Sequence, residues 1–272
     1  MRRHVALLPG LPEVCRLGLA TRGESPLEVQ DVLDAVGKGV NYLNWCGHPD
    51  GLSRAVAGLG PARDQVVVAW QIESRDAAEA EIELDAALRE LKSERVEVVT
   101  LYYVESEREW RRIARPNGAL ATLRAAQRAG KVGLVGLTSH QRGLAASWAE
   151  SGPLDLLMLR YNAAHRGAET EVLPLAERLG VSFVAYTCLR WGALLQGTPT
   201  DPPGFSPPSA RECYRFVLSE PRVGVALMAP DDRAELDHDL ELLDDWRPLD
   251  GEALSAMQAH GDRVHEHAGE FW

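Results

Sequence analysis

Short apolar segments alternate with longer amphipathic segments along most of the chain. The apolar segments at 66–70 and 181–185 are almost continuously hydrophobic, which is typical of strands covered on both faces. The amphipathic segments carry apolar residues at spacings of three and four, which predicts helices. Strands that alternate with helices in this way indicate a parallel sheet with helices outside it.

The number of apolar segments decides between an open sheet and a barrel. Strands are predicted near 15–20, 40–44, 65–72, 96–104, 132–137, 154–159, 181–186 and 223–228. Eight parallel strands are the number that closes an α/β barrel, and a length of 272 residues lies in the usual range of such barrels. We therefore predict the α/β class, a (β/α)8 TIM barrel, as a single domain over residues 1–272.

Glycine and proline mark where the predicted helices and loops end. Helices are expected at 26–36, 77–91, 118–129 and 169–179, with Gly130 and Gly180 as their C-terminal caps. The segment 197–209 contains five prolines and two glycines, which predicts an irregular loop, placed over the barrel mouth. An acidic helix is expected from Pro230 to Trp246, and a final helix from about Gly251.

Charge and cysteine content narrow the possible partners and compartment. The formal net charge of −11, with dispersed Lys and Arg, argues against binding to nucleic acid or anionic membranes. No apolar run is long enough to span a membrane, and Pro9 interrupts the short apolar stretch near the N-terminus. The four cysteines have no CxxC spacing. We expect a cytoplasmic protein with reduced thiols.

Three motifs in order resemble one enzyme family. Segment 129–139 reads AGKVGLVGLTS, Tyr161-Asn162 follows the sixth predicted strand, and segment 184–195 reads VAYTCLRWGALL. They are similar to the GKxxxIGxSN, YN and AYSPLxxGxL motifs of the aldo-keto reductases. That resemblance implies a barrel with a nicotinamide cofactor, usually NADPH, and a carbonyl substrate at the C-terminal ends of the strands.

The resemblance also shows that the family's catalytic positions have changed. The family's Asp falls on Asn44, its Lys on Gln71 and its His on Tyr102. Its Tyr falls on Pro49, where His48 is the nearest proton carrier. Because an anion and its partner cation are lost together, no buried charge is left unpaired. Strand alternation predicts that Tyr102 and Tyr103 point to opposite faces.

The positions that the resemblance assigns to the cofactor are also altered. Tyr186 matches the tyrosine that stacks on the nicotinamide, whereas Met158 replaces a glutamine that binds its carboxamide. Arg233 is the one cation expected near the adenosine phosphate, among several acidic residues. The other assigned positions are Thr138, Ser139, Thr187 and Leu189. A weakened site for NADP or NAD, or no cofactor at all, is expected.

Two functional hypotheses remain open. The favoured one is a pseudoenzyme: a repurposed, non-reducing barrel that holds a small-molecule ligand in its mouth. The alternative is an NAD(P)-dependent oxidoreductase acting on a carbonyl or alcohol, with Tyr102 or His48 as the proton donor. A phenol without a cationic neighbour is a weak acid at neutral pH, which argues against Tyr102 in that role.

Two weaker possibilities concern thiols and histidines. Cys46 or Cys188 would be a nucleophile if His48 or His140 served as its base. The C-terminal histidines are expected to be solvated surface residues and not a metal site, because helical spacing does not place all three on one face; they are His260, His265 and His267.

Overall fold

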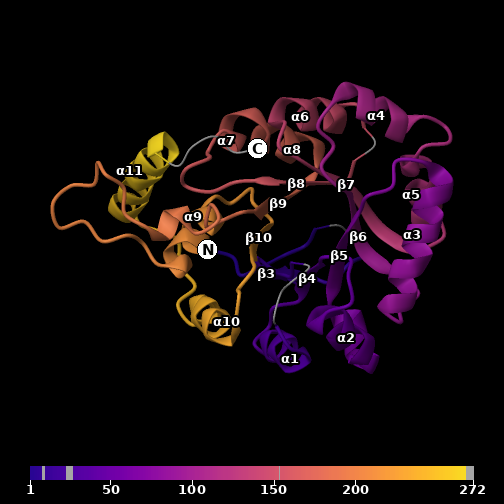
Figure 1. Cartoon of the computed structure of the whole chain (residues 1–272), viewed down its shortest axis with the longest axis horizontal. Coiled ribbons are helices and arrows are strands. Elements are labelled where there is room, and N and C mark those ends of the chain that lie inside the picture. The colour runs from indigo at the N-terminus through magenta and orange to yellow at the C-terminus, as the bar shows by residue number, and fades with distance from the viewer. Residues whose placement is uncertain (8–9, 23–26, 153, 268–272) are drawn as a thin grey trace.

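The predicted barrel is present in the computed structural model (Figure 1), which describes residues 1–7, 10–22, 27–152 and 154–267. Within these residues, parallel strands close a barrel in which each pairs with the next and the last pairs with the first. The strands are β3 (Leu17–Ala20), β4 (Tyr42–Trp45), β5 (Val67–Ile72), β6 (Val96–Leu101), β7 (Val132–Ser139), β8 (Leu156–Arg160), β9 (Ser182–Tyr186) and β10 (Val225–Met228).

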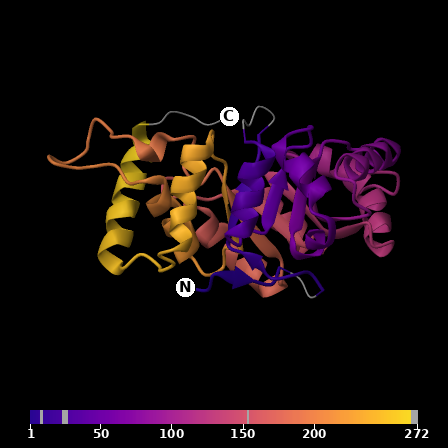
Figure 2. The ribbon, with the colours of Figure 1, turned by 90° about the horizontal axis from the view of Figure 1, so that it is seen from below.

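Helices surround the barrel between successive strands (Figures 1 and 2). They are α1 (Val29–Gly37), α2 (Gly51–Gly58), α3 (Ala77–Glu90), α4 (Glu107–Ala114), α5 (Ala119–Arg128), α6 (Arg142–Glu150), α7 (Ala168–Glu171), α8 (Leu173–Leu179), α9 (Ala210–Ser219), α10 (Arg233–Leu240) and α11 (Gly251–His267). Gly180 caps α8 with a φ of 69°, and Gly130 follows α5 with a φ of 78°. The left-handed backbone expected at both glycines is confirmed.

Side chains alternate between the barrel interior and the layer beneath the helices. On β5, Val67 and Ala69 belong to the interior cluster, whereas Val68 and Trp70 belong to the outer layer. A short antiparallel pair, β1 (His4–Val5) with β2 (Val14–Cys15), was not predicted. Leu7 and Val14, from this N-terminal segment, join the interior cluster.

Three predicted elements end differently in the structure. Strand β6 ends at Leu101, although it was expected to reach 104, because Tyr103 turns the backbone to a φ of 35°. The helix expected over 169–179 is divided into α7 and α8, with a proline in the first turn of α8. The acidic helix expected over 230–246 ends at Leu240 and continues as the 3-10 turn η3 (Glu241–Leu243).

The proline-rich segment was predicted to lie over the barrel mouth, but it does not. It runs past α11 at the edge of the molecule in both views (Figures 1 and 2). Asp201 accepts a hydrogen bond of 2.6 Å from Arg263 of α11, and the Arg263 guanidinium lies 4.8 Å from the Phe205 ring. The loop is drawn away from the mouth because polar and aromatic residues in it find partners on α11, which the proline content did not reveal.

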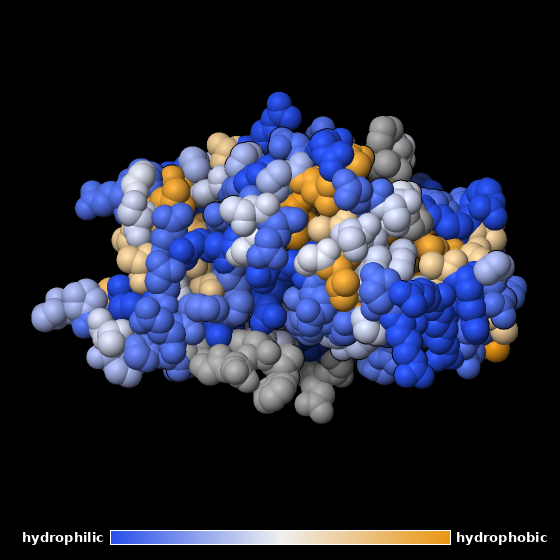
Figure 3. Space-filling model, turned by 90° about the horizontal axis from the view of Figure 1, so that it is seen from above, coloured by the Kyte–Doolittle hydropathy of each residue, from blue (hydrophilic) through white to orange (hydrophobic). Residues whose placement is uncertain are grey.

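The surface gives little sign of a large apolar interface on the face shown in Figure 3, where hydrophobic residues form small groups among hydrophilic ones. Among the described helices, none is both long and apolar enough to cross a membrane.

Candidate functional site

A cavity of about 320 Å³ lies at the C-terminal ends of the barrel strands, the face that carries the active site in α/β barrels. It extends from the ends of β3, β4 and β5 to the loops after β9 and β10. The lining residues are Ala20, Arg22, Asn44, Gln71, Tyr103, Thr138, Met158, Tyr186, Thr187, Cys188, Leu189, Trp191, Gly192, Leu195, Tyr214, Leu227, Ala229, Asp231 and Glu235.

Two carboxamides, Asn44 and Gln71, line the cavity from adjacent strands. Asn44 on β4 pairs with Ala69 on β5, and Gln71 lies two residues further along, on the same face of β5. Asn44 is only 3% exposed, and its Oδ1 atom has no hydrogen-bond partner among the described residues. An acceptor buried without a partner is costly. A donor from a bound molecule would satisfy it.

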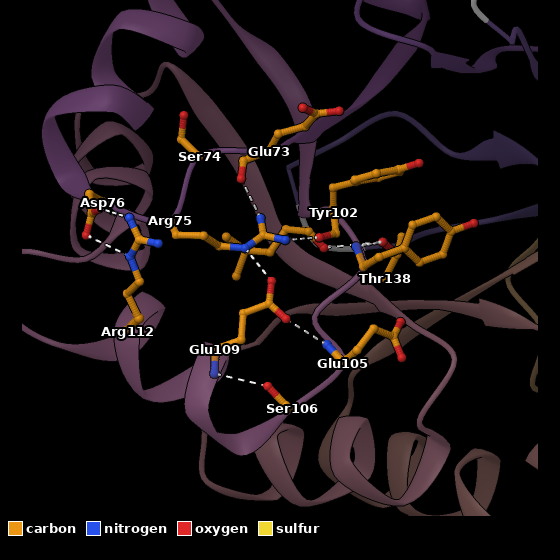
Figure 4. Close-up of polar contacts among 12 residues, drawn as sticks. Glu73, Ser74, Arg75, Asp76, Tyr102, Glu105, Ser106, Glu109, Arg112 and Thr138 are labelled. Atoms are coloured by element: carbon orange, nitrogen blue, oxygen red, sulfur yellow. Dashed lines mark hydrogen bonds and ion pairs between the residues drawn. The ribbon is translucent and has the colours of Figure 1, made fainter. Parts of the chain in front are cut away.

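Tyr103 enters the cavity because its backbone is held in an unusual conformation. A φ of 35° is disfavoured for a bulky residue. Its amide N–H donates to the Thr138 hydroxyl at 2.7 Å, and the carbonyl of Tyr102 before it accepts a hydrogen bond from the Arg75 guanidinium. Arg75 is itself fixed by Glu109 at 2.7 Å, as Figure 4 shows. Contacts on both sides therefore hold this turn.

Aromatic side chains surround the Tyr103 phenol. Its ring stacks on His140 with centroids 4.4 Å apart, and it meets Tyr186 edge to face at 6.1 Å. The Tyr186 hydroxyl donates to the Ser139 carbonyl at 3.4 Å. Burial raises the pKa of both phenols above the ordinary value of 10. Both therefore remain neutral hydrogen-bonding groups at physiological pH.

The two predicted proton donors, Tyr102 and His48, do not line this cavity. The Tyr102 ring lies against the Tyr103 ring, with centroids 4.4 Å apart. His48 lines a separate hollow beside α3, which also receives Glu83 and Glu90. Gln71 lines both hollows. The structure thus brings Asn44 and Gln71 together at the mouth and places His48 elsewhere.

Two predicted cofactor residues use their hydroxyl groups within the protein. Besides accepting from Tyr103, the Thr138 hydroxyl donates to the Leu101 carbonyl at 3.3 Å. The Ser139 hydroxyl accepts from the Gln141 amide at 2.9 Å, just before α6, and Ser139 does not line the cavity. Met158 does line it, with a thioether that is only a weak acceptor.

The turn after β9 forms one lip of the cavity. Thr187, Arg190 and Trp191 have positive φ values of 51°, 50° and 54°. The Thr187 hydroxyl donates to the Tyr186 carbonyl at 2.8 Å, while Leu189 contributes apolar lining. The Trp191 side chain is 64% exposed although it borders the cavity. An indole held open to solvent at the rim is available to a ligand.

Arg233, the predicted phosphate-binding residue, is already surrounded by carboxylates. Its guanidinium lies 2.9 Å from Asp237 on the same helix, and 3.1 Å and 2.7 Å from Asp31 and Asp34 of α1. The hydrogen bonds to these carboxylates raise the pKa of Arg233, and the bond to Asp237 has the largest effect. An incoming phosphate would have to compete with three carboxylates for this cation.

The thiol hypothesis finds no support in the structure. Burial raises the pKa of Cys188 to about 12, and its Sγ donates to the Ala185 carbonyl at 3.6 Å. Burial also raises the pKa of Cys46. Thiols with raised pKa values are poor nucleophiles at neutral pH.

One C-terminal histidine is not the solvated residue that was predicted. His260 is 1% exposed, and its Nε2 atom lies 2.9 Å from the Leu194 carbonyl. Its ring is covered by Phe205 of the proline-rich loop, with centroids 4.9 Å apart. Helical spacing alone did not show which of the three histidines is buried.

A buried carboxyl lies behind the cavity wall. Asp239 on α10 is 3% exposed, and Tyr214, which lines the cavity, is among the groups that influence its pKa. Burial raises the pKa of Asp239 to about 7. As the pH rises from about 4 to about 7, the unfolded chain loses this proton while the folded protein retains it. The contribution of Asp239 to the free energy of unfolding therefore falls between about pH 4 and pH 7 and is constant above pH 7.

We expect Asp239→Asn to remove that pH dependence. The variant should gain on the order of 4 kcal/mol over wild type at pH 8, and little near pH 4. Urea unfolding at both pH values measures the difference. A variant that is less stable than wild type at pH 8 would show that the ionised carboxylate is accommodated by the fold.

Comparison with known proteins places these features in a family. The model of the Aldo/keto reductase family matches residues 27–213. An aldo-keto reductase from Bacillus halodurans, in its holo form, superposes with a TM-score of 0.77 at 15% identity, over 96% of each chain. One from Klebsiella pneumoniae, in complex with NADP and acetate, has a TM-score of 0.74 at 17% identity, over 92% of each chain. No curated protein sequence matches the chain. Because the family model covers more than half of its length, the chain belongs to the aldo-keto reductase family.

Proposed function

We propose that this barrel binds a small organic molecule at its mouth and does not perform the carbonyl reduction of its family. The observation that carries the proposal is the pair of neutral carboxamides, Asn44 and Gln71, at the positions of the family's Asp and Lys. Without the lysine, neither nearby phenol has that cation to lower its pKa, and burial raises both pKa values. General acid catalysis works best when the donor's pKa lies near the working pH.

The phosphate end of the cofactor site expected from the family also supports the proposal. The Klebsiella pneumoniae neighbour is a complex with NADP. In this chain Arg233 is paired with three carboxylates, and Asp231 and Glu235 line the adjacent part of the cavity. These residues do not fit the extra phosphate of NADP, because like charges would repel it. NAD lacks that phosphate and meets less repulsion.

The nicotinamide end fits only in part. The Tyr186 ring lines the cavity, so a flat ring has a surface to lie against. The hydroxyls of Thr138 and Ser139 are bonded to backbone groups, which leaves fewer anchors for a carboxamide. We propose that dinucleotide binding is weak or lost. The free thiols of the described residues suit a reducing compartment, and we place the protein in the cytoplasm.

Titration with NADPH and NADH tests this function. Tryptophan quenching, and energy transfer to the nicotinamide, report binding of either cofactor. We expect no saturable binding of NADPH in the micromolar range, and NADH binding that is weaker than micromolar or absent. Saturable micromolar binding of NADPH would overturn the proposal and favour the oxidoreductase.

A further inference from the structure

The cavity has polar groups in its interior but keeps its charges at the rim. The charged residues among its lining are Arg22, Asp231 and Glu235. Arg22 forms an ion pair with Asp231, and the Glu235 carboxylate accepts the Asp231 amide N–H at 2.8 Å. Arg22 and Asp231 therefore already have each other as charged partners, and the Glu235 carboxylate already accepts a hydrogen bond. A charged ligand deeper in the cavity would lose water without gaining an opposite charge among the lining residues.

The polar groups deeper in the cavity are amides and phenols. Asn44 presents an acceptor that has no partner among the described residues, and Tyr103 presents a hydroxyl that remains protonated at physiological pH. A carboxamide and a phenol recognise a ligand by hydrogen bonds to its neutral polar groups.

The walls of the cavity favour a flat ligand. Tyr103, Tyr186 and Trp191 are aromatic, and they lie on different loops and strands around the opening. Aromatic rings gain most from offset stacking or edge-to-face contact with other rings. The exposed Trp191 indole leaves room for such a contact at the rim.

The backbone at Tyr103 indicates that its position in the cavity is maintained at a cost. Strained residues persist only where their surroundings fix them, and they are concentrated at functional sites. Here the Thr138 hydroxyl accepts a hydrogen bond from the Tyr103 amide. The Arg75 guanidinium donates to the Tyr102 carbonyl just before it (Figure 4). Arg75 lies outside the cavity lining. It can influence a ligand only through the turn that it holds.

We infer that the mouth is a site for an uncharged, flat ligand carrying an amide or hydroxyl group, read by the Asn44 carboxamide and the Tyr103 phenol. Arg75 is a positioning residue that, with Glu109, keeps Tyr103 in place. This inference rests on the proposed small-molecule function, because it names the class of molecule that the cavity takes.

A series of naphthyl compounds tests the ligand class. Naphthamide, naphthoate and naphthamidine share one ring system and carry a neutral, an anionic and a cationic head group at pH 7. Binding is followed by NMR at the Trp191 indole N–H, assigned with a Trp191→Phe variant. We expect naphthamide to bind at least about tenfold more tightly than either charged compound. Tighter binding of a charged compound would overturn the inference but leave small-molecule binding intact. No response to any of the three would overturn both.

Substitution of Asn44 tests the recognition group. Asn44→Leu removes the amide while keeping similar volume, and we expect naphthamide affinity to fall by about fivefold to tenfold. Asn44→Asp introduces a carboxylate and should make naphthamidine the preferred compound. If both variants bind naphthamide like wild type, Asn44 does not read the ligand.

A double-mutant cycle tests the positioning role of Arg75. We expect Arg75→Met to weaken naphthamide binding by about fivefold in the wild-type background and to have no effect in a Tyr103→Ala background. The matched control is Arg112→Met, which breaks an ion pair with Asp76 nearby but does not contact Tyr102. A purely structural role would weaken binding equally in both backgrounds, and that result would overturn the assignment.

Discussion

Replacing Glu97 with alanine is expected to destabilise the folded protein by about 3–5 kcal/mol, the usual cost of breaking a buried ion pair. Glu97 on β6 is 1% exposed. Its carboxylate lies 2.8 Å from Arg63 and 2.9 Å from Arg95, and it accepts the Val68 amide N–H at 2.8 Å. Its removal leaves the half-buried Arg63 guanidinium without its carboxylate partner and the Val68 amide without its acceptor.

Urea unfolding followed by circular dichroism measures this effect. The matched control is Asp64→Ala, which breaks a second ion pair of Arg95 at a site where the Asp64 side chain is 73% exposed. Exposed pairs contribute only about 0–1 kcal/mol, so the control should differ little from wild type. Equal losses in the two variants would show that burial does not govern the strength of this network.

Removing two of the carboxylates around Arg233 is expected to favour NADPH over NADH. The Asp34→Asn, Asp237→Asn double variant leaves Arg233 with one carboxylate partner, Asp31, instead of three. Because only NADPH carries the extra phosphate, its affinity relative to NADH should rise by at least about tenfold. Asp31 is kept, because its side chain also accepts the Glu28 amide N–H at the start of α1.

The control for this experiment must carry the same net charge. Asp85→Asn with Asp262→Asn removes two exposed carboxylates that pair with Lys131 and Arg166, away from Arg233. The control should leave the ratio of the two cofactor affinities unchanged. The same ratio in both double variants would mean that Arg233 does not face the phosphate position.

The strands of the barrel could be predicted from the sequence because each is a short apolar run with both faces covered. The predicted run at 132–137 starts where β7 starts and ends two residues before it, and the run at 181–186 begins one residue before β9 and ends with it. The course of the loop at 197–209 could not be predicted in this way. Its position depends on Asp201 and Phe205 finding Arg263 and His260 on a helix far along the chain.

The candidate site was predictable where a regular strand carries the side chain, or where a motif continues directly from a strand, as at Thr187 and Leu189 after β9. Asn44 and Gln71 lie on β4 and β5, and both line the cavity as their positions suggested. Tyr103 was not predicted as a lining residue, because the alternation of side chains along a strand was assumed to continue beyond Leu101. The strand ends at that residue, and the backbone turns at Tyr103. Arg75 gave no signal, since a single arginine in a loop does not reveal which carbonyl it will bind.

A carbonyl-reduction assay tests the central claim most directly. The protein, at high concentration, would be mixed with NADPH or NADH and a panel of aromatic and aliphatic aldehydes, and the loss of nicotinamide absorbance followed against Tyr102→Phe, Tyr103→Phe and a protein-free reaction. We predict that wild type matches the protein-free rate with both cofactors. Turnover above that rate, abolished in either tyrosine variant, would contradict the account and identify a rebuilt reductase site.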